Sequence, residues 1–92
     1  MENHEIMTVG KLIEQKRRAK RLRQDDLAFN CNITRKAMSN IETNKNLPGL
    51  PLFVKIAHEL DMNGYELLKE IEERGLLDIY LQKYRNNDDK KS

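Results

Sequence analysis

Two short stretches of the chain, residues 24–31 and 35–42, each have the apolar spacing of an amphipathic helix, and only three residues separate them. In each stretch the apolar side chains share one face of a helix. These side chains are Leu27, Ala28 and Cys31 in the first stretch and Ala37, Met38 and Ile41 in the second. The spacing predicts a helix-turn-helix.

The second stretch turns a polar face away from its apolar residues. This face carries Arg35, Lys36, Ser39 and Asn40. Arginine and lysine can donate to guanine, asparagine can pair with adenine through two hydrogen bonds, and serine can bond a base edge or a phosphate. The face is therefore typical of a helix that lies in the major groove of DNA.

Helical spacing continues on both sides of this unit, and no stretch keeps the alternation of a β-strand. A first helix is expected to begin after the N-cap Thr8 and to end near Lys20. Its predicted inner residues are Val9, Leu12, Ile13 and Ala19. The link of residues 44–51 contains both prolines, so we expect it to be non-helical.

Three further segments complete the expected all-α fold. An apolar stripe predicts a fourth helix through Leu52, Phe53, Ile56, Ala57 and Leu60. Asn63 and Glu66 have the spacing of a capping box that opens a fifth helix, which Gly75 interrupts. A last amphipathic piece is expected from Leu76 to about residue 85.

Length and composition narrow the class of protein. A chain of 92 residues forms one domain with a modest core, so a buried catalytic cleft is not expected. No apolar run reaches the roughly 20 residues that span a bilayer. Residues 1–7 lack the features of a signal peptide, so we expect a cytoplasmic location.

No pattern in the sequence indicates catalysis, a metal or a cofactor. His4 and His58 are isolated, and neither a Gly-rich phosphate loop nor a nucleophile with a base at motif spacing occurs. We therefore expect no enzymatic activity. The single cysteine, Cys31, cannot form an internal disulfide, and its place on an apolar face favours a core thiol over a redox role.

Charge is unevenly distributed along the chain. The net charge is +2, but residues 11–23 hold seven basic side chains and the single acid Glu14, a local net charge of +6. A basic run can be only a solvated helix face. Beside a helix-turn-helix it favours a surface that faces DNA phosphates.

Many separated positions between residues 9 and 68 fall in one register without gaps: Gly10, Ile13, Arg17, Leu22, Gln24, Leu27, Ala28, Ile33, Ser39, Ile41, Glu42, Pro48, Ile56, Ala57, Leu60, Leu67 and Leu68. In this register the chain resembles the lambda-repressor/Cro-like, or xenobiotic-response-element (XRE), helix-turn-helix family. The resemblance implies a five-helix lambda-repressor-like DNA-binding domain whose third helix lies in the major groove. The remaining residues would form a C-terminal helical extension.

The resemblance also implies roles for particular residues. Base contacts are implied for the recognition helix, residues 35–43, at Arg35, Lys36, Ala37 and Asn40. Ala37 can offer only an apolar contact, for instance to a thymine methyl group. Phosphate contacts are implied for Gln24, Ser39, Asn44 and Lys45. Arg17 and Glu42 match an ion pair, for which a structural role is favoured over DNA contact by Arg17.

Several positions depart from the family pattern. Arg23 replaces the usual Ser or Thr N-cap, at a typical cost of about 0.5–2 kcal/mol, and we expect it to contact a phosphate instead. Asparagine replaces glycine at Asn32 and Asn44, where a left-handed backbone remains accessible. Arg21 also replaces a glycine. For Phe29, off the apolar face, partial burial against a neighbouring helix is favoured over contact with a partner.

Residues 65–84 hold more apolar side chains than closure of a five-helix core requires. One recognition helix gives little specificity, so proteins of this kind usually bind DNA as dimers. We therefore expect part of this segment to form a two-fold homodimer interface rather than to fold back on its own domain. The predicted interface residues are Leu68, Ile71, Leu77, Tyr80, Leu81 and Tyr84.

These expectations divide the chain into a flexible tail (1–7), a helix-turn-helix DNA-binding domain (8–73) and a helical extension with a polar tail (74–92). The expected function is a sequence-specific double-stranded DNA-binding transcriptional regulator, a dimeric repressor at a palindromic operator. The alternative is a protein-interaction module, an antitoxin or antirepressor that uses the same fold to bind a protein partner.

Overall fold

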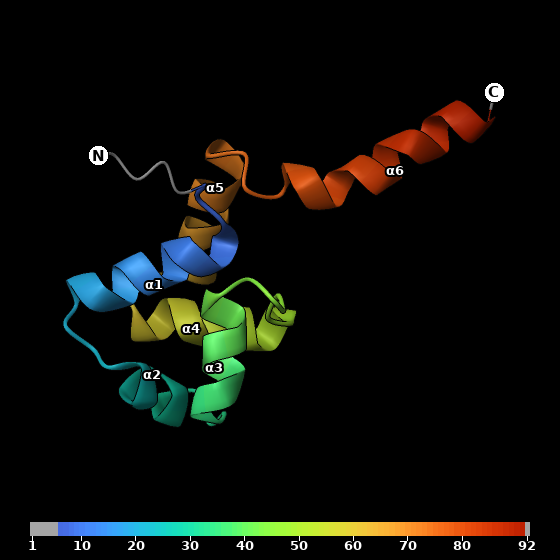
Figure 1. Cartoon of the computed structure of the whole chain (residues 1–92). Coiled ribbons are helices and arrows are strands. Elements are labelled where there is room, and N and C mark those ends of the chain that lie inside the picture. Colours follow the sequence, from blue (N-terminus) through green and yellow to red (C-terminus); the bar gives the residue numbers. More distant parts are fainter. Residues whose placement is uncertain (1–5, 92) are drawn as a thin grey trace, which may run out of the picture.

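This computed structural model describes residues 6–91. Those residues contain six helices and no strand. They are α1 (Val9–Ala19), α2 (Gln24–Asn30), α3 (Arg35–Glu42), α4 (Leu50–Glu59), α5 (Gly64–Glu73) and α6 (Asp78–Lys91) (Figure 1). The predicted all-α class is confirmed. His4 and most of the expected N-terminal tail lie outside the described residues.

Polar side chains fix where several helices begin. The hydroxyl of Thr8 accepts a hydrogen bond from the backbone N–H of Lys11 at 3.0 Å, so α1 begins where its sequence predicts. The carboxylate of Glu66 accepts from the backbone N–H of Asn63 at 2.8 Å, as a capping box requires.

Two details differ from the sequence-based expectation. α4 begins at Leu50, so Pro51 lies in its first turn rather than in a non-helical link. Proline is tolerated there because the N–H that it lacks would have no partner within the helix. Ala19 is exposed rather than inward, since the last turn of α1 reaches beyond the core, and residues 18–21 are all exposed.

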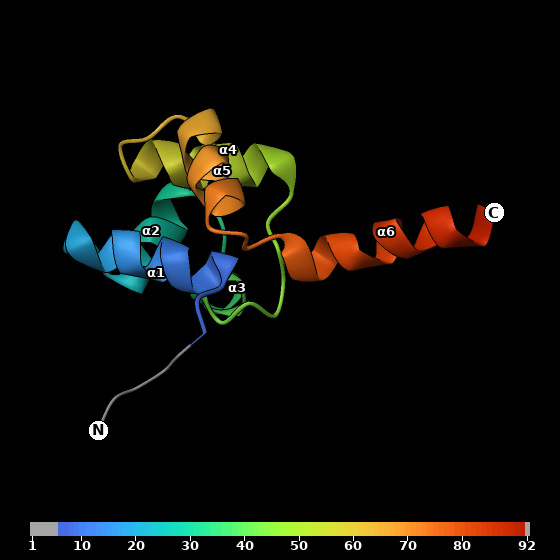
Figure 2. The same cartoon turned by 90° about the horizontal axis from the view of Figure 1, so that it is seen from above.

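Helices α1 to α5 pack around one apolar core, with α5 lying against α4 (Figure 2). All five helices contribute to its largest fully buried side chains, which are Leu12, Ile13, Leu27, Met38, Ile56, Leu67 and Ile71. Leu76, which follows α5, is also buried. The core therefore continues past residue 73.

Four non-glycine residues of the described chain have a left-handed backbone, with φ between 59° and 66°: Arg21, Asn32, Asn44 and Asp61. The two asparagines follow the prediction, because asparagine tolerates this region better than most residues. Arg21 lacks the short polar side chain that makes this backbone easier for asparagine and aspartate.

α6 projects away from the five-helix unit (Figures 1 and 2). Gly75, with a φ of 72°, lies in the turn between α5 and α6, where glycine avoids the strain of a side chain. No helix among the described residues is both long enough and apolar enough to cross a membrane.

Candidate nucleic-acid interface

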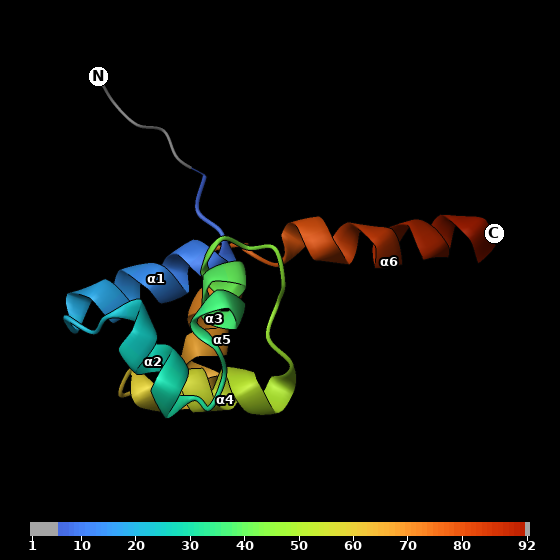
Figure 3. The ribbon, with the colours of Figure 1, turned by 60° about the horizontal axis from the view of Figure 1, so that its bottom comes forward.

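α3 lies at the surface beside α2 (Figure 3). The Met38 side chain of α3 is fully buried in the core, whereas Arg35 and Lys36 in the first turn of the helix are exposed. The other predicted contact residues of the helix are half-buried, namely Ala37, Ser39 and Asn40. The first turn of α3 is therefore its most accessible part.

Hydroxyl groups stabilise both ends of α3. The hydroxyl of Thr34 accepts from the backbone N–H of Ala37 at 3.0 Å and caps the first turn. At the other end, the hydroxyl of Thr43 donates to the backbone carbonyl of Ser39 at 2.8 Å. Capping matters here because an eight-residue helix has few internal hydrogen bonds to hold it.

An open, polar pocket of about 400 Å³ lies between the beginnings of α2 and α3. Its lining residues are Gln24, Arg35, Lys36 and Ser39. The structure thus brings four of the predicted DNA-contacting residues to one place. Their side chains can donate hydrogen bonds to an anion or to a base edge.

A buried ion pair joins α1 to the end of α3. Arg17 donates from Nε to Glu42 Oε2 at 2.7 Å and from Nη2 to Oε1 at 3.0 Å. This hydrogen bonding raises the pKa of Arg17. Because Arg17 is only 7% exposed, the geometry favours its structural role over contact with DNA.

Gln24 at the start of α2 extends this network. Its Nε2 donates to Glu42 Oε1 at 2.9 Å, which ties the beginning of α2 to the end of α3. A primary amide has a second N–H, which can donate to a phosphate while the first is bonded to Glu42. The contact therefore suits a residue that both braces α3 and binds DNA.

Asp25 lies between two arginines for which DNA contacts are predicted, a role that the sequence does not reveal. Its carboxylate is 3.4 Å from Arg23 Nη2 and 3.6 Å from Arg35 Nε. All three side chains are exposed, so both pairs are weak and can exchange for other partners. Asp26 accepts from the backbone N–H of Arg23 at 3.2 Å and partly replaces the missing N-cap.

Most cations of the basic run of residues 11–23 are paired with carboxylates. Apart from Arg17, its ion pairs are Lys11 and Arg18 with Glu14, Lys16 with Glu70, Lys20 with Asp61, and Arg23 with Asp25. The cations without an ion-pair partner among the described residues include Arg21, Lys36 and Lys45. Two of these three, Lys36 and Lys45, lie in α3 or in the loop that follows it.

The loop after α3 presents Lys45 and holds Asn44. The Lys45 side chain is exposed, and its backbone N–H donates to the carbonyl of Asn40 at 2.8 Å. Asn44 uses its side chain within the protein: Oδ1 accepts from the N–H of Gly10 at 3.2 Å, and Nδ2 donates to the hydroxyl of Tyr80 at 2.9 Å. A phosphate contact by this side chain would have to replace one of these bonds.

Five of the six predicted interface residues are accessible. Leu68, Leu81 and Tyr84 are exposed by 40%, 46% and 59%, and Leu77 and Tyr80 are half-buried. The prediction for Ile71 is wrong, because this side chain is 1% exposed. Ile71 lies one turn after Leu67 on the same face of α5, so it belongs to the core.

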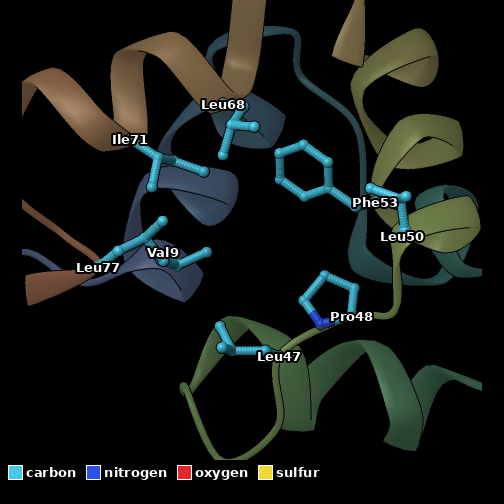
Figure 4. Close-up of a pocket in the computed structure, with 8 residues that line it drawn as sticks. All are labelled: Val9, Leu47, Pro48, Leu50, Phe53, Leu68, Ile71 and Leu77. Atoms are coloured by element: carbon cyan, nitrogen blue, oxygen red, sulfur yellow. The ribbon is translucent and has the colours of Figure 1, made fainter. Parts of the chain in front are cut away.

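An apolar pocket of about 190 Å³ adjoins the exposed leucines (Figure 4). Its walls come from α1, the link before α4, α4, α5 and the segment before α6: Val9, Leu47, Pro48, Leu50, Phe53, Leu68, Ile71 and Leu77. Three predicted interface residues, Leu68, Leu77 and the buried Ile71, therefore line a cavity that is open to solvent.

Three other side chains have clear environments. Phe29 is 82% exposed, so the expected partial burial is wrong: α2 turns Leu27 and Ala28 to the core, and no other helix covers Phe29. Cys31 is buried, and burial raises the pKa of its thiol. His58 is exposed, and no group of three metal-ligating side chains occurs among the described residues.

A capped surface helix with a polar first turn, braced by the helix before it, is the arrangement found in helix-turn-helix DNA-binding proteins. The helix-turn-helix family model matches residues 13–67, more than half of the chain. The chain belongs to this family, in its lambda-repressor/Cro-like (XRE) branch, and is a DNA-binding transcriptional regulator.

Comparison with curated protein sequences gives no match. Among solved structures, one similar to this chain is that of SinR, the master regulator for biofilm formation, in complex with DNA. The sequence identity is 27% and the TM-score is 0.60, and the match covers 66% of this chain and 98% of that chain. The DNA-binding domain of the P22 c2 repressor is 21% identical with a TM-score of 0.66, and the match covers 73% of this chain and 88% of that chain. A chain of the complex of SinR and SinI is 23% identical with a TM-score of 0.62, and the match covers 91% of this chain and 94% of that chain. The last two likenesses show the fold alone.

Proposed function

We propose that this protein is a sequence-specific double-stranded DNA-binding repressor, which acts as a homodimer and occludes RNA polymerase at a palindromic operator. The observation that supports this function most directly is the polar pocket at the start of α2 and α3, where Gln24, Arg35 and Lys36 converge. The structure of SinR, at 27% identity, is a complex with DNA, which adds support.

The proposed contacts fall into two groups, those with base edges and those with phosphates. The first turn of α3 enters the major groove, and base edges are read by Arg35, Lys36, Ala37 and Asn40. The surrounding phosphates are contacted by Arg23, Gln24, Ser39 and Lys45, while the Asn44 side chain stays bonded to Gly10 and Tyr80 and holds the loop. Lys45 supports this division, since it is exposed, has no ion-pair partner among the described residues, and lies three positions beyond the end of α3.

Dimerisation is proposed to use the apolar surface of α5 and α6. We assign to it Leu68, Leu77, Tyr80, Leu81 and Tyr84, and leave Ile71 to the core. In this arrangement residues 8–73 form the DNA-binding domain, and residues 74–92, together with Leu68 of α5, supply the contact between two copies. A two-fold dimer presents two recognition helices to half-sites about one helical turn apart.

Selection of bound sequences from a random pool of double-stranded DNA tests this function. A palindromic consensus with half-sites about 10 base pairs apart is the expected result. On the selected DNA, Arg35→Ala should cost about 1–3 kcal/mol and relax specificity at particular base pairs. Lys45→Ala should weaken binding to all sequences similarly and flatten the salt dependence. If both variants lose the same amount of affinity on selected as on random DNA, the proposal that Arg35 contacts base edges is contradicted.

The second candidate function is a protein-interaction module, an antitoxin or antirepressor. The exposure of Phe29 favours it, since an 82% exposed phenylalanine on a rigid helix suits an apolar partner surface. The SinR and SinI complex provides a parallel for a protein partner of this fold. A pool that yields no enriched sequence would favour this candidate, and Phe29→Ser should then abolish capture of the partner without affecting the fold.

A further inference from the structure

Tyr80 connects α6 to the loop that follows the recognition helix. The Asn44 side-chain nitrogen donates to the Tyr80 hydroxyl at 2.9 Å, in a partly buried position. Tyr80 lies outside the matched family segment of residues 13–67, so this contact is additional to the helix-turn-helix unit. Its partner Asn44 directly precedes Lys45, the exposed cation of the loop.

The orientation of the Asn44 amide is fixed from its other side. Its oxygen accepts from the backbone N–H of Gly10 at 3.2 Å. A backbone N–H can only donate, so the oxygen must face Gly10 and the nitrogen must face Tyr80. The Gly10 N–H lies in the first turn of α1, where it has no partner within the helix. Loss of the amide would therefore leave a donor unsatisfied.

The backbone around Asn44 is also closely held. A Cβ atom at Gly10 would clash with the carbonyl oxygen of Ile41, so α1 and the end of α3 touch through their backbones. Asn44 has a φ of 66°, and its N–H donates to the Ile41 carbonyl at 3.0 Å. Three elements thus determine the shape of the loop: α1, α3 and, through Tyr80, α6.

We propose that Tyr80 is a positioning residue for DNA binding: its hydroxyl orients the Asn44 amide and thereby holds the loop that presents Lys45 to the DNA backbone. The inference rests on the proposed function, in which Lys45 contacts a phosphate. It also makes α6 part of the DNA-binding machinery, because a movement of α6 that breaks this hydrogen bond weakens the phosphate contact.

Fluorescence anisotropy with the full chain and labelled double-stranded DNA tests the proposal. Tyr80→Phe removes only the hydroxyl and should raise the Kd about three- to tenfold on both selected and random DNA, the factor that corresponds to one hydrogen bond. Tyr65→Phe is the matched control, since Tyr65 is 71% exposed in the first turn of α5 and lies outside the proposed DNA and dimer contacts. Its affinity should equal that of the unchanged protein.

A double-variant cycle with Lys45→Ala separates positioning from general stability. If Tyr80 acts through Lys45, then Tyr80→Phe should add nothing to the loss that Lys45→Ala causes, and each single variant should flatten the salt dependence. A purely structural role would lower the affinity by the same factor in both backgrounds and would overturn the proposal. So would a Tyr80→Phe variant that binds as tightly as the Tyr65→Phe control.

Two further results complete the test. If Lys45→Ala itself leaves affinity unchanged, the proposed phosphate contact fails and the role of Tyr80 fails with it, whereas base reading by α3 is judged separately with Arg35→Ala. Asn44→Gly keeps the left-handed backbone but removes the amide, so it should reproduce the loss and make Tyr80→Phe silent. An additive effect of these two changes contradicts the inference even if one variant is poorly folded.

Discussion

At the scale of single residues, Arg21 has the backbone that fits its side chain least well. Its φ of 60° lies in a region that costs an ordinary side chain roughly 1–2 kcal/mol. No ion pair among the described residues offsets that cost. Glycine adopts this backbone without that cost. Its greater freedom in the unfolded chain, however, removes about 0.5–1 kcal/mol of the stability that such a substitution would add.

We therefore expect Arg21→Gly to raise the free energy of unfolding by about 0.5–1 kcal/mol, measured as a higher urea midpoint. Arg21→Ala is the matched control, because it removes the charge but keeps the Cβ atom. A glycine variant that is no more stable than the alanine variant would show that the strain is not significant.

Cys31 provides a probe for opening of α2. Its side chain is 7% exposed, and burial raises the pKa of the thiol. Because the thiolate is the reactive form, a thiol reagent should label the native protein far more slowly at neutral pH than it labels the same chain in denaturing urea. Similar rates in the two conditions would mean that α2 separates readily from the core.

At the scale of helices, Lys16 and Glu70 join α1 to α5 through an ion pair of 2.8 Å. The hydrogen bond from Lys16 is the main cause that lowers the pKa of Glu70, and Arg74 acts in the same direction. A carboxyl group with a lowered pKa in the folded state stabilises the protein above its ordinary pKa. That contribution is lost as the pH falls through the lowered pKa.

Glu70→Gln should therefore reduce the free energy of unfolding by about 0.5–1 kcal/mol at neutral pH and have no effect in acid, where the carboxyl group is protonated in both states. Glu73→Gln is the control, because Glu73 is exposed and lies 4.0 Å from its partner Lys69. Urea unfolding of both variants at the two pH values gives the comparison. A loss for Glu70→Gln that persists in acid would indicate packing rather than charge.

Helix positions could be predicted from the sequence more fully than the electrostatics of the site. Inward faces follow from local periodicity, and Leu12, Leu27 and Met38 are buried as expected. The pairing within the basic run could not be predicted in full, because Glu70 and Asp61 reach it from distant parts of the chain and no local pattern shows this. The bond between Asn44 and Tyr80 spans 36 positions and is equally invisible in the sequence.

At the scale of the whole molecule, α6 carries apolar side chains away from the core that they could otherwise join (Figures 1 and 3). Ile79, Leu81 and Tyr84 are exposed by 66%, 46% and 59%. Apolar side chains gathered on a projecting helix commonly mark a protein interface. A second copy that packs against this helix would cover them and set the distance between the two recognition helices.

The combined variant Leu81→Glu and Tyr84→Glu tests that arrangement without disturbing the core, since both side chains are exposed in the single chain. It should sediment as a monomer and bind a palindromic site about a hundredfold more weakly, because each half-site is then bound independently. Gln82→Glu is the control, because it places a negative charge on the same helix outside the apolar surface. Circular dichroism should show equal helix content in all three proteins. If the double variant still sediments as a dimer, the interface lies elsewhere than on α6.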